Sequence, residues 1–181
     1  MIMKIPELDS SRLIFREYSS HDLESFVSIL SNPKILRYLP STEPWPSETV
    51  EKWLLSSQAH WLNEDFGWWV LEHKIDKKAI GWCGLRKLES TGEVEVLYLI
   101  AEEYWGQGLA TEGARISIEY GFNSVNLDEI IGLVLNGNIA SSRVLEKSGL
   151  RYQERTEYFN LECLKYIIDK TIFGETYQNK T

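Results

Sequence analysis

The chain has 181 residues and a mass of 21.0 kDa, which suits one domain that buries roughly 70% of its extended surface. Its 43% hydrophobic and 25% charged residues exclude disorder, and its two cysteines exclude a disulfide framework and favour a reduced, cytoplasmic setting. Lys and Arg total 19 against 27 Asp and Glu, so the net charge of -8 disfavours nucleic-acid binding and is compatible with a cationic or amine substrate. We expect neither a secretory signal nor a membrane span.

The first third of the chain predicts one strand and two helices. Residues 12–18 form an apolar-rich run that predicts a strand. A helix capped by Ser20 and ended by Pro33 follows, because apolar residues recur at helical spacing at Leu23, Phe26, Val27 and Leu30. Residues 40–46 contain three of the five prolines and predict a loop, after which Ser47 opens the second helix.

The middle of the chain predicts an antiparallel meander. Residues 67–73, 79–88 and 93–100 are rich in β-forming residues and are separated by short polar turns. In the third of these strands period-2 alternation places one set of side chains on a common face: Glu93, Glu95, Leu97 and Leu99.

The last part mixes helices and strands. A glycine-bearing loop leads into a helix with small and apolar residues at Ala110, Ala114, Ile118 and Phe122. A strand over residues 129–135, a helix ending at Gly149, and strands over 151–156 and 164–172 follow, with a loose tail over 174–181. Without a linker or an internal repeat, this order predicts one α+β domain over residues 1–181, with its core at about 10–172.

The loop over residues 104–112 carries the chemistry, and its sequence is YWGQGLATE. Gly106 and Gly108 let the backbone approach a ligand, and the following helix directs its N–H groups and positive dipole end at the loop, which suits a pyrophosphate. A dinucleotide fingerprint needs glycine where Thr111 stands, and the Gly-Lys-Ser/Thr of a P-loop is missing. The alternative is a tight turn with no ligand.

This loop resembles the acetyl-CoA pyrophosphate loop of the GNAT acetyltransferases, in the branch that contains the ribosomal-protein-alanine N-acetyltransferases. Trp105 stands where that branch typically has tryptophan. A second block over residues 138–150, NIASSRVLEKSGL, is similar to the branch's Asn-x-x-Ser…Glu-Lys-x-Gly helix, and residues 31–39 carry a weaker likeness. The resemblance covers about residues 10–172.

The resemblance implies the GNAT fold, with a central, mostly antiparallel, mixed twisted sheet of about seven strands flanked by about four helices. It implies acetyl transfer from acetyl-CoA, without a metal, to a primary amine of a peptide N-terminus or a small molecule, by direct attack in a ternary complex. A homodimer is compatible with the branch. The alternatives are a non-catalytic acyl-CoA-binding sensor and a structural domain with a fortuitous loop.

The resemblance also implies a set of acetyl-CoA contacts, from the strand end, the loop and the second block. Asn138 would hold the pantetheine arm or simply cap its helix, and Lys147 would contact a phosphate or interact with the helix dipole. The full set is Tyr98, Leu99, Ile100, Trp105, Gly106, Gln107, Gly108, Leu109, Ala110, Thr111, Asn138, Ser141 and Lys147.

Two residues are the expected catalytic pair. Glu95 aligns with a strand glutamate common in the branch and is the candidate general base, directly or through water; the alternative is a solvent-facing strand residue. Glu93 shares its face and could act as the base instead or raise the pKa of Glu95. Ser141 is the candidate proton donor to the leaving thiolate; the alternative is a first-turn serine bonding to the helix cap. Other branches use a tyrosine at the position of Leu145, so Ser141, Tyr98 or water must supply the proton here.

The acceptor pocket is predicted with less support from motifs. Trp45, Trp68 and Glu93 are its candidate lining residues, while core packing is the alternative for at least two of Trp45, Trp68 and Trp69. The three histidines show no metal-ligand spacing.

Overall fold

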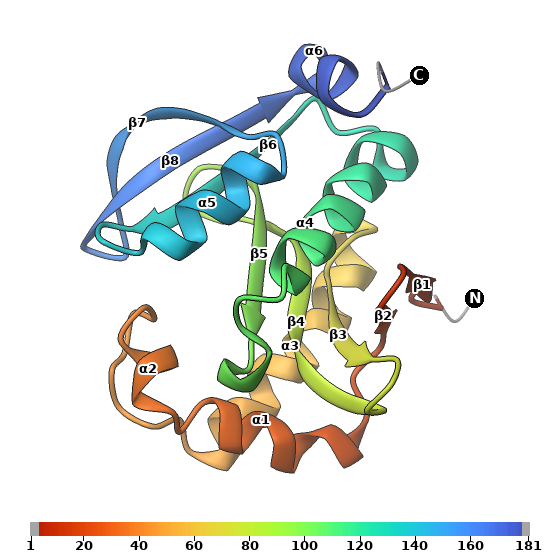
Figure 1. The fold of residues 1–181 in the computed structure, drawn as a ribbon, viewed down its shortest axis with the longest axis vertical. Coiled ribbons are helices and arrows are strands. Elements are labelled where there is room, and N and C mark those ends of the chain that lie inside the picture. The colour runs from red at the N-terminus through yellow and green to blue at the C-terminus, as the bar shows by residue number, and fades with distance from the viewer. Residues whose placement is uncertain (1–3, 179–181) are drawn as a thin grey trace.

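The computed structural model describes residues 4–178, which form one sheet with helices on both faces (Figure 1). The eight strands of these residues lie in the order β1-β2-β3-β4-β5-β6-β8-β7. Their bounds are β1 (Leu8–Asp9), β2 (Leu13–Arg16), β3 (Trp68–His73), β4 (Lys78–Lys87), β5 (Val94–Ile100), β6 (Glu129–Leu135), β7 (Arg151–Tyr158) and β8 (Leu161–Asp169).

Within the same residues there are six α-helices. They are α1 (Leu23–Ile29), α2 (Pro33–Leu36), α3 (Ser47–Glu64), α4 (Leu109–Tyr120), α5 (Ile139–Lys147) and α6 (Lys170–Phe173). The expected fold class is confirmed, and the elements beyond the expected seven strands and four helices are short: β1 has two residues, and α2 and α6 have four each.

Two of these short helices correct the sequence prediction. Pro33 begins α2 instead of only ending the preceding helix, because the Asn32 side chain accepts a hydrogen bond from Lys34 N at 2.9 Å and caps the new helix. The last strand ends at Asp169 rather than at 172, because the Asp169 carboxylate accepts from Ile172 N at 2.8 Å and starts α6.

The expectation of a loose tail from residue 174 is wrong for its first part. Residues Gly174–Gln178 form a π-helical turn, and the Tyr177 hydroxyl donates to the carbonyl of Ser148 at 2.6 Å. Phe173 and Tyr177 stack with their ring centroids 4.8 Å apart. Aromatic packing and this hydrogen bond hold the turn on the body of the protein; residues 179–181 lie outside the described part.

The decisive feature of the sheet lies between β5 and β6. These two strands run parallel and pair at a single register position, Glu95 with Ile131, whereas all other neighbouring strands are antiparallel. Beyond Glu95 the strands diverge, and Figure 1 shows β6 turning away from β5. The β6-facing backbone edge of β5 toward Ile100 therefore has no strand partner in the described residues.

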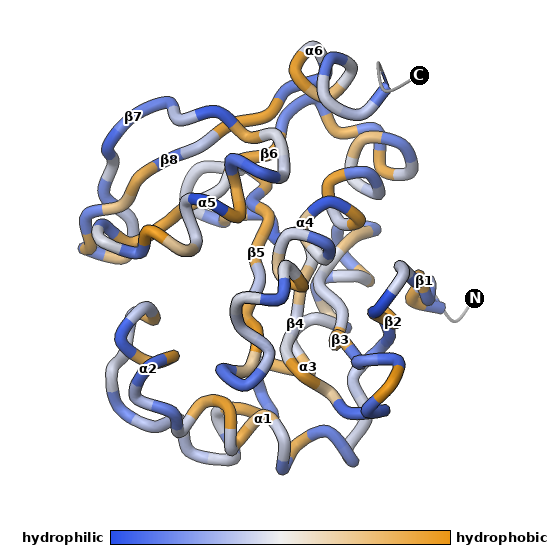
Figure 2. Tube along the Cα trace, viewed as in Figure 1, coloured by the Kyte–Doolittle hydropathy of each residue, from blue (hydrophilic) through white to orange (hydrophobic). Residues whose placement is uncertain are grey.

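The two faces of β5 contact different helices. Val96 and Ile100 belong to the core that includes residues of α4 and α5, whereas Leu99 belongs to the core built with α1 and α3. The period-2 alternation predicted for this strand is therefore present. At the far edge, β7 is hydrophilic along most of its length (Figure 2) and largely exposed, as suits an unpaired edge.

Among residues 4–178, every helix is too short or too polar to cross a lipid bilayer.

Candidate functional site

The loop before α4 has the geometry of an anion-binding turn. Gly106 and Gly108 both have left-handed backbones, with φ of 74° and 79°. A Cβ at Gly106 would have no atom within 4 Å, and one at Gly108 would meet only the Arg12 guanidinium at 3.7 Å. The glycines are thus required by backbone conformation and leave open space above the loop. The free N–H groups of the first turn of α4, which begins at Leu109, border that space.

Trp105 fastens this loop to the end of β5. Its indole Nε1 donates to the carbonyl of Ile100 at 2.7 Å, while 41% of the residue remains exposed. The Ile100 carbonyl therefore already accepts one bond from within the chain. Of the three strand-end residues predicted to contact pantetheine, Tyr98 and Leu99 lie along the stretch where β6 has diverged.

Glu95 is buried, with 5% of its surface exposed, so the solvent-facing alternative is wrong. It lies opposite Arg86 of β4 in the sheet, and Arg86 Nε donates to Glu95 Oε1 at 2.8 Å. Burial raises the pKa of Glu95 above its ordinary value, and the attraction and hydrogen bonds of Arg86 only partly oppose this. A carboxyl with a raised pKa is suited to accept a proton near neutral pH.

Arg86 is itself held between two aromatic rings. Its guanidinium carbon lies 5.5 Å from the ring centroid of Trp53 on α3 and 5.9 Å from that of Phe159. Phe159 occupies the β7–β8 turn, is 60% exposed and has a φ of 51°, which is rare for an aromatic residue. The Glu95 carboxylate is therefore paired with the Arg86 guanidinium, and this guanidinium in turn contacts two aromatic rings.

Glu93 lies on the same strand face and lines an open cleft of about 520 Å³. Lys165 Nζ lies 2.5 Å and the Tyr158 hydroxyl 2.9 Å from its carboxylate oxygens. Burial tends to raise the pKa of Glu93, but the hydrogen bonds from Lys165, Tyr158 and Thr91 outweigh it, so the pKa is lowered. Glu93 is thus a charged wall of the cleft and not a base. The lining residues are Ser90, Thr91, Glu93, Thr156, Glu157, Tyr158, Phe159, Asn160 and Lys165.

Tyr98 and Ser141 meet across the space between β5 and α5. The Tyr98 hydroxyl lies 2.8 Å from Ser141 Oγ and donates to the Ser141 carbonyl at 3.0 Å. Burial raises the pKa of Tyr98, so its hydroxyl keeps its proton throughout the physiological range. Two of the three proton sources considered from the sequence are therefore one hydrogen-bonded pair.

Asn138 performs the helix-cap role. Its side-chain oxygen accepts from Ser141 N at 3.2 Å, at the start of α5. Because this cap also fixes the first turn of α5, it sets where Ser141 lies relative to Tyr98. A pantetheine contact by the amide nitrogen of Asn138 is compatible with this cap and stays a prediction.

Comparison with known proteins decides the family. Residues 12–151 match the family model described as the acetyltransferase (GNAT) domain. The chain belongs to the GNAT acetyltransferase family. As a GNAT protein it is an acetyl-CoA-dependent N-acetyltransferase, which sets aside a structural domain with a fortuitous loop.

Individual relatives agree in sequence and fold. The chain is 28% identical over 163 residues to the uncharacterized N-acetyltransferase YoaA of Bacillus subtilis, covering 84% of this chain and 92% of that one. An acetyltransferase structure from Agrobacterium tumefaciens has a TM-score of 0.82, with 21% identity and coverage of 94% and 98%. The structure of AAC(6')-Ib with ribostamycin and coenzyme A has a TM-score of 0.76, with 22% identity and coverage of 94% and 99%.

Other predicted site residues of this GNAT protein lie apart from the cluster. Lys147 is exposed in the last turn of α5, at the opposite end of that helix from Asn138, in a position that suits interaction with the helix dipole, and its contact with a phosphate stays a prediction. Leu145, at the position of the tyrosine acid of other branches, is buried in the core at 1% exposure.

The tryptophans mostly build the core. Trp68 and Trp69 are 5% and 1% exposed, and Trp68 stacks on Trp53 with centroids 4.8 Å apart. The expectation that Trp68 walls an open acceptor pocket is wrong, because Trp53 of α3 covers it. Trp45 is half-buried and packs edge-on against Trp53 at 6.3 Å, so it stays a candidate at the rim.

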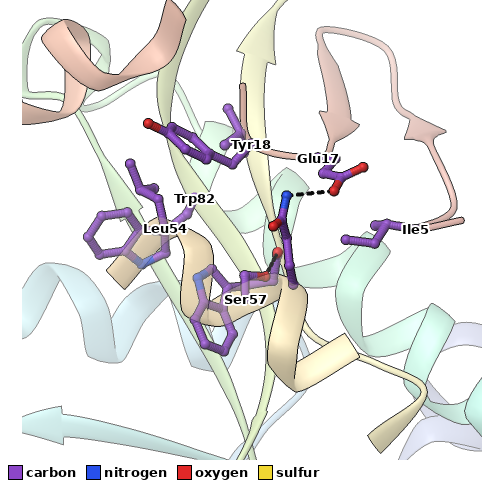
Figure 3. A pocket seen from close by; sticks show the side chains of 9 residues that line it. Ile5, Glu17, Tyr18, Leu54, Ser57 and Trp82 are labelled. Carbon is purple, nitrogen blue, oxygen red and sulfur yellow. Dashed lines mark hydrogen bonds between the residues drawn. The ribbon is translucent and has the colours of Figure 1, made fainter. Parts of the chain in front are cut away.

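A second, much smaller cavity lies beneath α3 and is distinct from the cleft. Tyr18, Leu54, Ser57 and Trp82 are among the side chains around it, and Figure 3 shows the Glu17 carboxylate hydrogen-bonded beside it. Its volume is about 10 Å³, which admits at most a single water molecule. It is too small for an acceptor.

Sequence reasoning missed the cations that complete the site. Arg86 pairs with Glu95 because of the β4–β5 register, Lys165 of β8 pairs with Glu93 just before β5, and Arg12 contacts the loop from near the start of the chain. The lone available signal was the excess of Asp and Glu over Lys and Arg, which cannot assign ion pairs. In the described residues no group of three or more His, Cys, Asp or Glu side chains is arranged to hold a metal.

Proposed function

We propose that this enzyme transfers the acetyl group to a primary amine by direct attack in a ternary complex, with β5 as the shared surface of both substrates. One observation carries the proposal: Glu95 and Tyr98 lie on opposite faces of β5, just where β6 diverges. An amine approaching from the α1–α3 face and a thioester from the α4–α5 face would meet at this strand.

The acetyl-CoA side uses the loop and the freed strand edge. Bound acetyl-CoA supplies the activated thioester. The left-handed glycines and the α4 N-terminus suit its pyrophosphate, and the partnerless edge of β5 offers backbone groups to its peptide-like arm. Backbone N–H groups at this edge would also stabilise negative charge on the thioester oxygen.

The two proton transfers are assigned to the two opposite faces of β5. Glu95 takes the proton of the acceptor ammonium, directly or through water, and its raised pKa supports this role. On the other face, the Ser141 hydroxyl, which shares a hydrogen bond of 2.8 Å with Tyr98, gives a proton to the leaving thiolate, and water returns a proton to Ser141.

The acceptor proposed is a cationic amine, from a small molecule or a peptide N-terminus. The open cleft lined by Glu93 carries the carboxylates of Glu93 and Glu157 against the single cation Lys165 among its lining residues. The net charge of -8 favours encounter with cations, and the fold neighbour AAC(6')-Ib was solved with the amine-rich ribostamycin.

A two-step experiment tests this proposal. Acetyl-CoA is titrated by calorimetry, and thiol release is then followed across a panel of aminoglycosides, polyamines and short peptides with free N-termini. We expect binding, followed by turnover with at least one cationic amine. Absence of binding would refute the loop assignment, and binding with no turnover on any amine would favour the sensor.

A further inference from the structure

The pyrophosphate loop is held from outside by the β1–β2 turn, through the carboxylate of Glu112. Glu112 is the fourth residue of α4, and Oε1 accepts from Ser10 Oγ at 2.6 Å, Ser11 Oγ at 3.1 Å and Arg12 N at 2.9 Å. Its second oxygen accepts from Arg12 Nε at 2.7 Å. One carboxylate therefore ties the first turn of α4 to a segment about one hundred residues earlier in the chain.

Arg12 reaches past Glu112 to the loop itself. Its Nη1 donates to the carbonyl oxygen of Gln107 at 2.7 Å, between the two left-handed glycines. All peptide bonds in the described chain are trans, and in a trans peptide the C=O and the next N–H point in opposite directions. Fixing the Gln107 carbonyl toward Arg12 thus aims the Gly108 N–H away from Arg12, to the other side of the loop.

The charges of Glu112 and Arg12 also affect the proposed anion site. Glu112 lies in the first turn of the helix whose N-terminus faces the proposed anion, and its carboxylate would repel a pyrophosphate if left alone. Arg12 forms an ion pair with it at 2.6 Å and keeps 42% of its own side chain exposed beside the loop. The guanidinium neutralises the carboxylate and sets the peptide plane with one planar group, which a lysine cannot do at both partners.

We propose that Arg12 and Glu112 are positioning residues that preset the Gln107–Gly108 peptide for the pyrophosphate of acetyl-CoA. This inference rests on the proposed function of the loop. It assigns to the N-terminal strand pair, which belongs to the sheet edge farthest from β6, a direct effect on cosubstrate affinity.

The test compares two thioesters, of which acetyl-CoA contains the pyrophosphate and S-acetylpantetheine lacks it. The dissociation constants of acetyl-CoA and S-acetylpantetheine are measured for wild type, Arg12→Ala, Arg12→Lys and Arg12→Ala/Glu112→Gln. For Arg12→Ala we expect about a tenfold weaker acetyl-CoA affinity, from loss of charge-assisted hydrogen bonds, with S-acetylpantetheine unchanged. Arg12→Lys recovers part of the loss, and the double variant binds acetyl-CoA more tightly than Arg12→Ala because the unneutralised carboxylate is gone.

Lys74→Ala is the matched control, because Lys74 binds the same turn through Asp9 and the Ser10 carbonyl but not through Glu112. It should leave both affinities unchanged. A wild type that binds the two thioesters equally refutes the loop assignment. If wild type prefers acetyl-CoA but Arg12→Ala keeps that preference, or loses both ligands equally, the positioning role is refuted. Should Arg12→Ala fail to fold, full preference in Arg12→Lys overturns the role and a reduced one supports it.

Discussion

Glu95 and Tyr98 are three residues apart on β5 and project from opposite faces of the sheet. Glu95 lies against Arg86, whereas Tyr98 reaches Ser141 on α5. An odd spacing along a strand always separates two side chains in this way. The proposed base and the proposed proton source are thus placed on the two sides of one backbone, and the reaction is expected to take place along it.

The Glu95→Gln variant should lose turnover by about 10²–10⁴-fold and keep its affinity for acetyl-CoA, because a general base contributes about that much. The base must be deprotonated, so wild-type kcat rises with pH through a pKa that burial has raised above the ordinary carboxyl range. This rise should be missing in the variant. Rate-against-pH profiles check it, with the exposed Glu89→Gln as the control. An unchanged profile would remove Glu95 from the mechanism.

The Tyr98→Phe variant should lower kcat by about tenfold or more, with the KM for acetyl-CoA little changed. The ring still packs, but the hydroxyl that hydrogen-bonds to Ser141 Oγ and holds the proposed proton donor in place is lost. Ser141→Ala should have the larger effect, since it removes the group nearer the thiolate in the proposed order. Steady-state kinetics decide this, with Tyr120→Phe as a matched loss of a tyrosine hydroxyl on α4. Full activity in both site variants would leave water as the acid.

The Gly108→Asp variant should abolish acetyl-CoA binding. The position has a φ of 79°, and the new carboxylate would stand in the loop and repel the pyrophosphate. Gly92→Asp is the control, because Gly92 has a φ of 76° and an open Cβ position but lies before β5, at the opposite end of that strand from the loop. Calorimetry on both variants separates backbone strain from ligand repulsion. Retained affinity in Gly108→Asp would show the loop assignment to be wrong.

The Glu112→Gln variant should be less stable at neutral pH by about 1–3 kcal/mol, the usual contribution of hydrogen bonds to a charged group. Burial alone would raise the pKa of Glu112, but its bonds from Ser10, Arg12 and Ser11 lower it. A lowered pKa means that this stabilisation is present above the unfolded value, about 4.3, and is lost as the pH falls through the folded value. Urea unfolding between pH 3 and 7, a range chosen about these values, should show a shallower acid loss in the variant. An equal loss of stability with falling pH in wild type and variant would contradict the stabilising role assigned to the Glu112 carboxylate.

Much of the fold was predictable because it depends on local pattern. The alternation over residues 93–100, the helix spacing after Gly108 and the strand over 129–135 all appear in the structure within a residue or so. Of the boundaries that failed, those at Pro33 and at Asp169 depend on side-chain caps, which compete with the strand and loop signals around them, while the last strand also begins earlier than expected, at Leu161.

The sequence by itself determined the glycine loop, the capped α5 and the pair of glutamates at positions 93 and 95, because each is a matter of residue type at short spacing. Tertiary structure alone decided that Arg86 neutralises Glu95, that Tyr98 meets Ser141, and that Arg12 holds the loop from the start of the chain. These contacts depend on strand register and on the divergence of β5 from β6, which arise from the packing of the whole sheet. The contribution of the acidic composition likewise depends on the tertiary structure, which decides which carboxylate each Lys or Arg side chain pairs with.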